Sequence, residues 1–271
     1  MELKKWEKKV AGLYNRKKRD FNYLLANDSI IHHHNGICRK NLKKPKTQET
    51  LLNFLHKAET DTSLYGFRFF SKFKTFKNKK ILDAGCGRGG SSILMASKFK
   101  GAEIKGINIS DYQLLCARRI AKKKVKKNIS FFKRSMLNTR FAKSQFDMIW
   151  ACESTEHLSN LKDWFSEADR IASKKARMII IAWVKNEKNP KALKYSKLID
   201  AAYTTCIHFD KEYEETYGRW KLKQKIDLTD LTVPYWRIRK MAESRTGTEK
   251  FMLEAFEQRA ALYRLYVYDL V

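Results

Sequence analysis

The sequence predicts an α/β protein built on a doubly wound parallel sheet, and three observations lead to this prediction. Strand-like apolar runs alternate with helical stretches between residues 80 and 183, the order typical of parallel strands joined by crossover helices. The first run ends in a glycine-rich turn that leads directly into a helix, as in nucleotide-binding sheets. The run 177–183 is almost entirely apolar, as expected of a parallel strand covered on both faces. Ligands of such sheets bind at the carboxyl ends of the strands, so functional residues are expected there.

The glycine-rich turn follows the strand-like run 80–84. Asp83 precedes Gly85, Gly87 and Gly89 in a G-x-G-x-G spacing, and residues 93–96 begin a helix. Glycines adopt positive φ angles freely and let the backbone approach a bulky ligand. Related turns bind dinucleotides, so the spacing favours a cofactor site over a purely structural turn without naming the cofactor.

Composition limits the classes of protein that need considering. The 271 residues suffice for one α/β domain with additions. No apolar run is long enough to span a membrane, and the first residues are too charged for a secretory signal. Five scattered cysteines without a CxxC spacing predict reduced thiols, no zinc site and a cytoplasmic protein.

The net charge of +28 leaves several partners open. Clustered cations bind nucleic-acid phosphates, yet the lysines are spread along the whole chain. Solvated faces, phosphorylated small molecules and acidic membrane surfaces would each account for such a composition. The charge alone decides nothing.

The segment before the first strand is expected to hold helices and ligand contacts. Trp6, Val10 and Tyr14 lie at helical spacing, and Thr47 precedes a second helix as a capping residue. Between them stands a polar run made of His32, His33, His34 and Asn35. Adjacent side chains point in different directions, so polar contacts to a substrate, for instance to its phosphates, are favoured over a shared metal ion.

The remaining elements follow in order along the chain. A helix is expected at 111–127, with an apolar stripe that includes Leu114 and Leu115. Strands are expected at 102–110, 129–133, 146–150, 177–183 and 263–268. Glu153 comes just after the run 146–150, so it falls at the carboxyl edge of the sheet, beside the glycine turn.

The acid and the G-x-G-x-G turn resemble the first motif of class I S-adenosylmethionine-dependent methyltransferases. This resemblance implies a Rossmann-like, seven-stranded sheet whose last strand is antiparallel, with S-adenosylmethionine on the turn. In that family the residue that matches Asp83 meets the ammonium end of the methionine moiety, and the turn of Gly85 and Gly87 makes room for the cofactor. The positions that match the ribose and adenine contacts are Asn108, Ser110, Gln113, Met136 and Leu137. The family usually has an acid in place of Asn108, and an amide with a hydroxyl can make the same hydrogen bonds.

Other motifs are more particular. The histidine run, the glycine turn, Glu-Ser-Thr at 153–155 and the Asp-Leu-Thr and Pro-Tyr-Trp groups within 227–239 resemble the geranyl diphosphate C-methyltransferases. The resemblance implies methyl transfer from S-adenosylmethionine to an alkene carbon of an isoprenoid diphosphate. The favoured substrate is geranyl diphosphate, methylated at C2, with Mg²⁺ bound to its diphosphate. The matching substrate-binding positions are His32, His33, His34, Asn35, His208, Tyr235 and Trp236. Asn35 departs from that family, which typically has a tyrosine there facing the diphosphate.

Methylation of an alkene requires a group that stabilises a carbocation and a base that removes a proton. Aromatic faces stabilise cations; Tyr203 stands at the position of the family's aromatic residue, and Trp183 is a further ring. Glu153 matches the family's base through its Glu-Ser-Thr context, and Glu156 is the alternative base three residues on.

These expectations describe one catalytic domain with additions. Residues 1–78 form an N-terminal helical lid and substrate-binding segment, and residues 79–271 form the S-adenosylmethionine-binding domain, with insertions at about 185–220 and 229–262. The expected partner is a small isoprenoid diphosphate, without nucleic acid or an integral membrane segment, and a homo-oligomer stays open. Two alternatives remain: a methyltransferase for another lipophilic small molecule, which would need no Mg²⁺, and a basic RNA-binding or RNA-methylating protein, which would retain RNA with a steep salt dependence.

Overall fold

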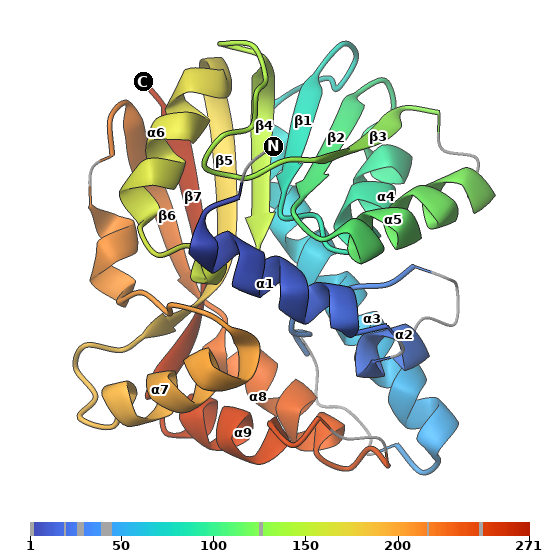
Figure 1. Ribbon diagram of the computed structural model, residues 1–271, viewed down its shortest axis with the longest axis vertical. Helices are drawn as coiled ribbons and strands as arrows, with labels where there is room; N and C mark the ends of the chain where they lie inside the picture. The colour runs from blue at the N-terminus through green and yellow to red at the C-terminus, as the bar shows by residue number, and fades with distance from the viewer. Residues whose placement is uncertain are drawn as a thin grey trace.

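A computed structural model describes residues 3–18, 20–25, 30–38, 45–124, 127–215, 217–243 and 246–271. Within these residues a seven-stranded sheet runs through the molecule (Figure 1), in the order β3-β2-β1-β4-β5-β7-β6. The strands are β1 (Lys80–Ala84), β2 (Glu103–Asn108), β3 (Ile129–Lys133), β4 (Phe146–Cys152), β5 (Ala172–Lys185), β6 (Trp220–Asp227) and β7 (Ala261–Leu270). Strands β1 to β5 pair in parallel, whereas β7 is antiparallel to both β5 and β6. The doubly wound sheet with an antiparallel last strand is therefore confirmed.

Helices connect the strands and extend the chain before β1. The α-helices are α1 (Lys5–Arg16), α2 (Phe21–Leu25), α3 (Gln48–Phe67), α4 (Gly90–Lys98), α5 (Asp111–Lys123), α6 (Leu161–Ile171), α7 (Ala192–Tyr203), α8 (Thr229–Arg239) and α9 (Glu249–Glu257), and the short 3₁₀ turns are η1 (Arg68–Lys72), η2 (Thr155–His157) and η3 (Asp210–Glu214). The predicted cap of α3 is confirmed, because the Thr47 hydroxyl accepts the backbone N–H of Thr50 at 3.2 Å. This bond satisfies one of the donors that every helix start leaves free.

The two larger of the three hydrophobic clusters in the described part of the chain lie on opposite faces of the sheet, because successive strand residues point to opposite sides. In β1, Ile81 joins the core shared with α3, α4 and α7 to α9, whereas Leu82 joins the core beneath α6. The apolar stripe of α5 is narrower than expected. Leu114 is 1% exposed and Leu115 is 54% exposed, because adjacent helical residues are rotated by about 100° from one another. The helix also ends at Lys123 rather than at residue 127.

The carboxyl ends of the parallel strands meet at one edge of the sheet, and segments from both ends of the chain cover that edge. Helix α1 crosses it, and α7, α8 and α9, which come from the connections β5–β6 and β6–β7, lie beyond it (Figure 1). Residues 30–38 are held against α8 by two hydrogen bonds, from the Cys38 N–H to the Leu231 carbonyl at 2.8 Å and from the Thr232 hydroxyl to the Gly36 carbonyl at 2.9 Å. The structure thus encloses a space at the edge where ligands of this kind of sheet bind. None of the described helices combines the length and the apolar character needed to cross a membrane.

Candidate active site

Three cavities that share lining residues lie at the carboxyl edge of the sheet. The first, which we call the turn cavity, holds about 660 Å³ of empty space between α1, the glycine turn and the ends of β2 and β4. The second, the aromatic cavity, holds about 900 Å³ and is lined by Trp183, Tyr203, Tyr235 and Trp236 among others. The third, the inner cavity, holds about 290 Å³ and lies between the histidine run and Asp83. Each is bordered by elements that are distant in sequence.

Four side chains separate the turn cavity from the aromatic cavity and line both of them. They are Tyr14, His33, Glu153 and His157. His33 also lines the inner cavity, so it touches all three spaces. The Tyr14 hydroxyl lies 2.8 Å from His157 Nε2, which fixes both rings at this boundary.

Glu153 occupies this boundary because of the backbone that follows β4. Its φ angle is +46°, a left-handed conformation that is uncommon for a residue with a Cβ, and its N–H donates to the Ile181 carbonyl at 2.8 Å. One carboxylate oxygen accepts the backbone N–H of Asn35 at 2.6 Å. Burial raises the pKa of Glu153 well above its usual range, and the neighbouring Glu156 raises it further. A carboxyl group of this kind accepts a proton more readily than an exposed one.

Glu156, the alternative base, lies elsewhere. It lines the aromatic cavity but not the turn cavity, and its Oε1 accepts the backbone N–H of Trp183 at 2.8 Å. Burial raises its pKa to about 7. Of the two carboxylates, only Glu153 faces both ligand spaces.

The glycine turn lines the turn cavity and the inner cavity, and Asp83 lines the inner cavity. Gly85 has a φ of +79°, and a Cβ there would lie 2.4 Å from the Ser154 Cβ, so this position requires glycine. Asp83 is 2% exposed, accepts the Ser92 hydroxyl at 2.5 Å and borders the inner cavity. Burial raises the pKa of Asp83 to about 7. Among the described residues no cation forms an ion pair with this carboxylate, so it suits a positively charged ligand group.

The predicted ribose and adenine positions divide into two groups. Asn108, Gln113 and Met136 line the turn cavity, and the Asn108 amide donates to Gln113 Oε1 at 2.8 Å. Ser110 is not brought to any of the three cavities: its hydroxyl caps α5 by accepting the Gln113 N–H at 3.2 Å and donates to Asn15 at 2.8 Å. Leu137 packs against the core beneath α6 instead of lining a cavity.

The histidine run is split between the cavities as the directions of its side chains predict. His33 and His34 line the aromatic cavity, whereas His32 borders only the inner cavity. Burial lowers the pKa of His33 to about 3 and that of His34 to about 4, so both rings are neutral near pH 7. Over the described part of the chain there is no cluster of three or more side chains able to hold a metal ion.

His208, predicted to bind substrate, lies outside the three cavities. Its Nε2 is 3.0 Å from the Leu158 carbonyl and its Nδ1 is 3.3 Å from a carboxylate oxygen of Glu212. These contacts fix the loop before η3. In this arrangement His208 contacts its own neighbourhood and lines none of the three cavities.

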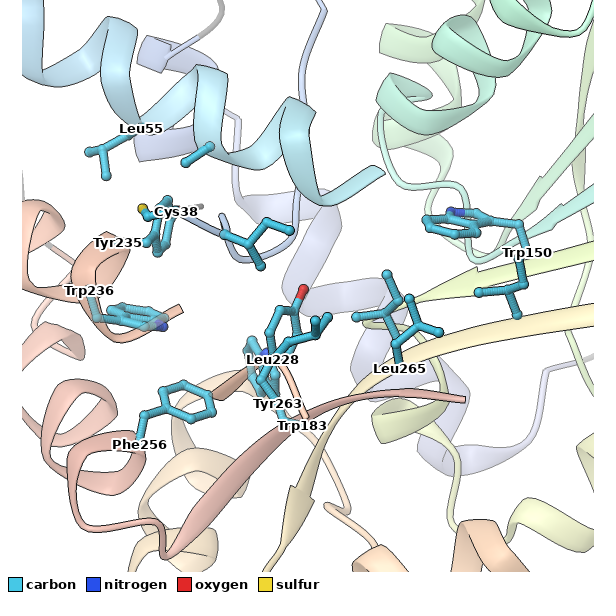
Figure 2. Close-up of a cluster of buried hydrophobic side chains, with 14 of the residues drawn as sticks. Cys38, Leu55, Trp150, Trp183, Leu228, Tyr235, Trp236, Phe256, Tyr263 and Leu265 are labelled. Carbon is cyan, nitrogen blue, oxygen red and sulfur yellow. The ribbon is translucent and has the colours of Figure 1, made fainter. Parts of the chain in front are cut away.

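The aromatic cavity is a box of rings held by Asn35. Trp183 and Tyr203 meet edge to face with centroids 5.2 Å apart, and Tyr235 and Trp236 of α8 do so at 5.7 Å; Figure 2 shows Trp183, Tyr235 and Trp236 within one buried cluster. The side-chain oxygen of Asn35, oriented to suit its donors, accepts the indole N–H of Trp183 at 3.2 Å and of Trp236 at 3.1 Å. The residue that departs from the resembling family therefore orders two walls of the box.

Two cations of the aromatic cavity were not identified from the sequence. Lys17 and Arg239 both line it; burial lowers the pKa of Lys17, and the charge of Arg239 lowers it further. Arg239 is 5% exposed, its Nε has no hydrogen-bond partner in the described structure, and its guanidinium lies 4.0 Å from the centroid of the Phe21 ring. The pair of basic residues around Ile238, next to Pro-Tyr-Trp, is the signal that could have found Arg239. For Lys17 only the tertiary packing of α1 gives the position.

The fold and the site define an α/β enzyme with a cavity on the glycine turn that borders, at a buried glutamate, a cavity lined by aromatic rings. Comparison with known proteins agrees. A family model described as a methyltransferase domain matches residues 75–228, and the chain belongs to this methyltransferase family.

Several relatives match nearly the whole chain. The geranyl diphosphate 2-C-methyltransferase of Saccharopolyspora erythraea is 29% identical over 97% of this chain and 94% of its own length, and that of Streptomyces coelicolor is 28% identical over 98% and 93%. Among solved structures, a geranyl diphosphate methyltransferase in complex with GPP and sinefungin superposes with a TM-score of 0.93 at 26% identity, over 100% of both chains. The Streptomyces coelicolor enzyme with Mg²⁺, geranyl diphosphate and S-adenosyl-L-homocysteine gives a TM-score of 0.90 at 26% identity, again over 100% of both chains.

Proposed function

We propose that this protein transfers a methyl group from S-adenosylmethionine to an alkene carbon of an isoprenoid diphosphate, with C2 of geranyl diphosphate as the first candidate. The observation that carries the proposal is the position of Glu153, a buried carboxylate that faces both the turn cavity and an aromatic box. Carbon methylation of an alkene needs a base beside a cation-stabilising surface, whereas methylation of an oxygen or nitrogen does not. The full-length similarity to geranyl diphosphate 2-C-methyltransferases supports the same substrate class.

S-adenosylmethionine fits the residues of the turn and inner cavities. Bound there, it supplies an electrophilic methyl group. The carboxylate of Asp83, which has no ion-pair partner among the described residues, suits its ammonium group, and the Asn108–Gln113 pair suits the ribose hydroxyls. Met136 lines the same cavity as that pair and is the proposed contact for adenine. Gly85, whose lack of a Cβ allows the close approach of Ser154, belongs to the same wall.

The substrate is proposed to lie in the aromatic cavity. The rings suit a prenyl chain, and Lys17, Arg239 and the neutral histidines are the available donors for a diphosphate. Mg²⁺ commonly binds through substrate phosphates and water with one or two carboxylates. Because the described residues hold no ready metal cluster, the ion would gain most of its ligands from the diphosphate and water.

Different side chains of the aromatic cavity stabilise the cation and remove the proton in the proposed reaction. The π electrons of the alkene form the new C–C bond to the methyl group as the bond from sulfur to that methyl breaks, and a tertiary cation is left on the neighbouring carbon. The faces of Tyr203 and Trp183 stabilise that charge, and the closed box excludes water that would capture it. Glu153 takes a proton from the methylated carbon, and the electrons of that C–H bond restore the double bond.

Product analysis tests the function directly. With S-adenosylmethionine, Mg²⁺ and a panel of C5, C10 and C15 diphosphates, the C10 substrate is expected to give a product heavier by one CH₂ unit, detected by mass spectrometry. Removal of Mg²⁺ with a chelator is expected to suppress this product, because the diphosphate then lacks its counter-ion. Methylation of a non-phosphorylated lipophilic compound that continues in the presence of chelator would point to a different substrate class.

The affinity for S-adenosyl-L-homocysteine is expected to rise with pH until about pH 7 and then to level off. Only the ionised carboxylate of Asp83 can pair with the ligand ammonium, and burial raises its pKa to about 7, so binding at lower pH must first release a proton. Below that pKa, the dissociation constant should fall by up to about tenfold for each unit by which the pH rises. Calorimetry from pH 5.5 to 8.5 measures this, and Asp83→Asn should flatten the curve. Parallel curves for the two proteins would show that another group controls the pH dependence.

A further inference from the structure

Arg88 is a buried cation in the middle of the glycine turn, and its partners come from the N-terminal segment. Its side chain is 0% exposed. Its guanidinium donates to both carboxylate oxygens of Asp20, at 2.7 and 3.0 Å, and to the Lys17 carbonyl at 2.5 Å. This two-pronged geometry is the most directional form of a charged hydrogen bond. The turn is thereby joined to the chain just after α1.

The position of this ion pair matters because α1 covers the turn cavity. Glu7, Val10 and Tyr14 of α1 form part of the wall of that cavity. A ligand in this cavity would therefore lie against α1. The Arg88–Asp20 pair fixes the chain just after this helix.

A second chain of polar contacts connects the glycine turn to the segment just after α1, through residues at the predicted ribose site. Asp20 lies 3.5 Å from His33 Nε2, and the other ring nitrogen of His33 lies 3.2 Å from the Gln113 amide nitrogen. Gln113 in turn accepts from Asn108, whose amide also donates to the Gly87 carbonyl at 3.3 Å. Because burial lowers the pKa of His33 to about 3, the ring is neutral, with Nδ1 accepting from Gln113 and the Nε2–H directed at Asp20. The contacts thus form a closed ring from the turn through the ribose site to Asp20 and back to Arg88.

We propose that Asp20 and Arg88 form a latch that couples occupancy of the cofactor cavity to closure of α1. The proposal rests on the proposed function in one respect, namely that the turn cavity holds the cofactor. Both residues are positioning residues: a bound ligand orders Asn108 and Gln113, which align His33 and Asp20, and the latch then holds α1 over the ligand. Closure by the latch should in turn slow release of the demethylated cofactor.

The test uses Asp20→Asn, with Asp163→Asn as a matched control. Asp163 forms an ion pair with Lys4, the residue just before α1, at 3.5 Å. Both side chains are exposed, at 67% for Lys4 and 46% for Asp163, and exposed pairs contribute little. Calorimetry with S-adenosyl-L-homocysteine is expected to show affinity about 5- to 150-fold lower in Asp20→Asn, the usual range for coupled sites, and unchanged within about twofold in Asp163→Asn. A stopped-flow measurement should show faster ligand dissociation in Asp20→Asn alone.

Proteolysis reports on closure itself. Arg16 and Lys18 are exposed trypsin sites at the end of α1, and cleavage there requires local opening. S-adenosyl-L-homocysteine is expected to slow this cleavage in the wild type and in Asp163→Asn, and to have little effect in Asp20→Asn.

A second variant at position 20 tests the latch if the first does not fold. Asp20→Glu keeps a carboxylate beside Arg88, so it serves as the test variant if Asp20→Asn does not fold. It should still weaken binding at least about fivefold, because the longer side chain no longer fits the paired hydrogen bonds of the Arg88 guanidinium. Equal affinity and equal protection in the wild type and the folded Asp20 variant would overturn the latch. A wild type that binds no S-adenosyl-L-homocysteine at all would instead overturn the proposed function, and the latch with it.

Discussion

Replacement of Glu153 by glutamine is expected to lower turnover by about two to four orders of magnitude, the usual contribution of a general base. Glutamine keeps the size of the side chain and an oxygen that can accept the Asn35 N–H, which now lies 2.6 Å from the carboxylate, but it cannot take a proton. Binding of S-adenosyl-L-homocysteine and of substrate should persist. Because the cation would live longer, products of water capture or of misplaced deprotonation should appear in the mass spectrum.

Glu156→Gln is the matched control for this experiment. It removes a carboxylate from the same buried region, but one that faces only the aromatic cavity and is held by the Trp183 N–H. A much smaller loss is expected. An inactive Glu156→Gln beside an active Glu153→Gln would exchange the two roles, and full activity in both would rule out a carboxylate base.

Asp83→Ala is expected to weaken cofactor binding by about two to four orders of magnitude. The carboxylate is 2% exposed, and removal of one partner from a buried ion pair costs about 3–5 kcal/mol, with 1.4 kcal/mol for each factor of ten. Calorimetric titration with S-adenosyl-L-homocysteine measures the loss, and a thermal melt shows whether the fold is kept.

Asp147→Ala provides the comparison for Asp83→Ala. This aspartate lies in β4, near the opposite edge of the sheet, and pairs with Lys79 at 2.9 Å. Its loss should lower stability slightly and leave cofactor affinity unchanged. Normal affinity in the folded Asp83→Ala protein would remove the basis for placing the cofactor on this turn.

The parts of the site that could be predicted from sequence are those fixed by local backbone geometry. Asp83, the glycine turn and Glu153 stand directly at strand ends, and the carboxyl ends of parallel strands must meet at one edge. Lys17 and Arg239 could not be found in this way, because α1 and α8 reach the cavity only through tertiary packing.

Two predicted contacts, Ser110 and His208, lie outside the three cavities. Ser110 lies two residues past the end of β2, and its hydroxyl is used to cap α5, which helix starts require before any ligand is bound. His208 satisfies a carbonyl and a carboxylate in its own neighbourhood. The type of a side chain shows what it can bind. Whether it faces a cavity depends on the hydrogen bonds that it makes to neighbouring groups, and these cannot be read from the sequence.

The place of β7 in the sheet has a consequence for how the molecule is made. This strand is paired on both sides, with β5 along nine register positions from Arg177↔Asp269 to Lys185↔Ala261 and with β6 along its other edge. During synthesis β5 and β6 leave the ribosome well before β7, so β5 has an open edge and β6 has no partner until the segment 261–270 arrives. The half of the sheet that supports the aromatic box therefore forms late and through contacts distant in sequence, the kind of step that is slow and prone to aggregation. Shortening of the chain into this strand should give an insoluble product, even though every residue of the glycine turn has already been made.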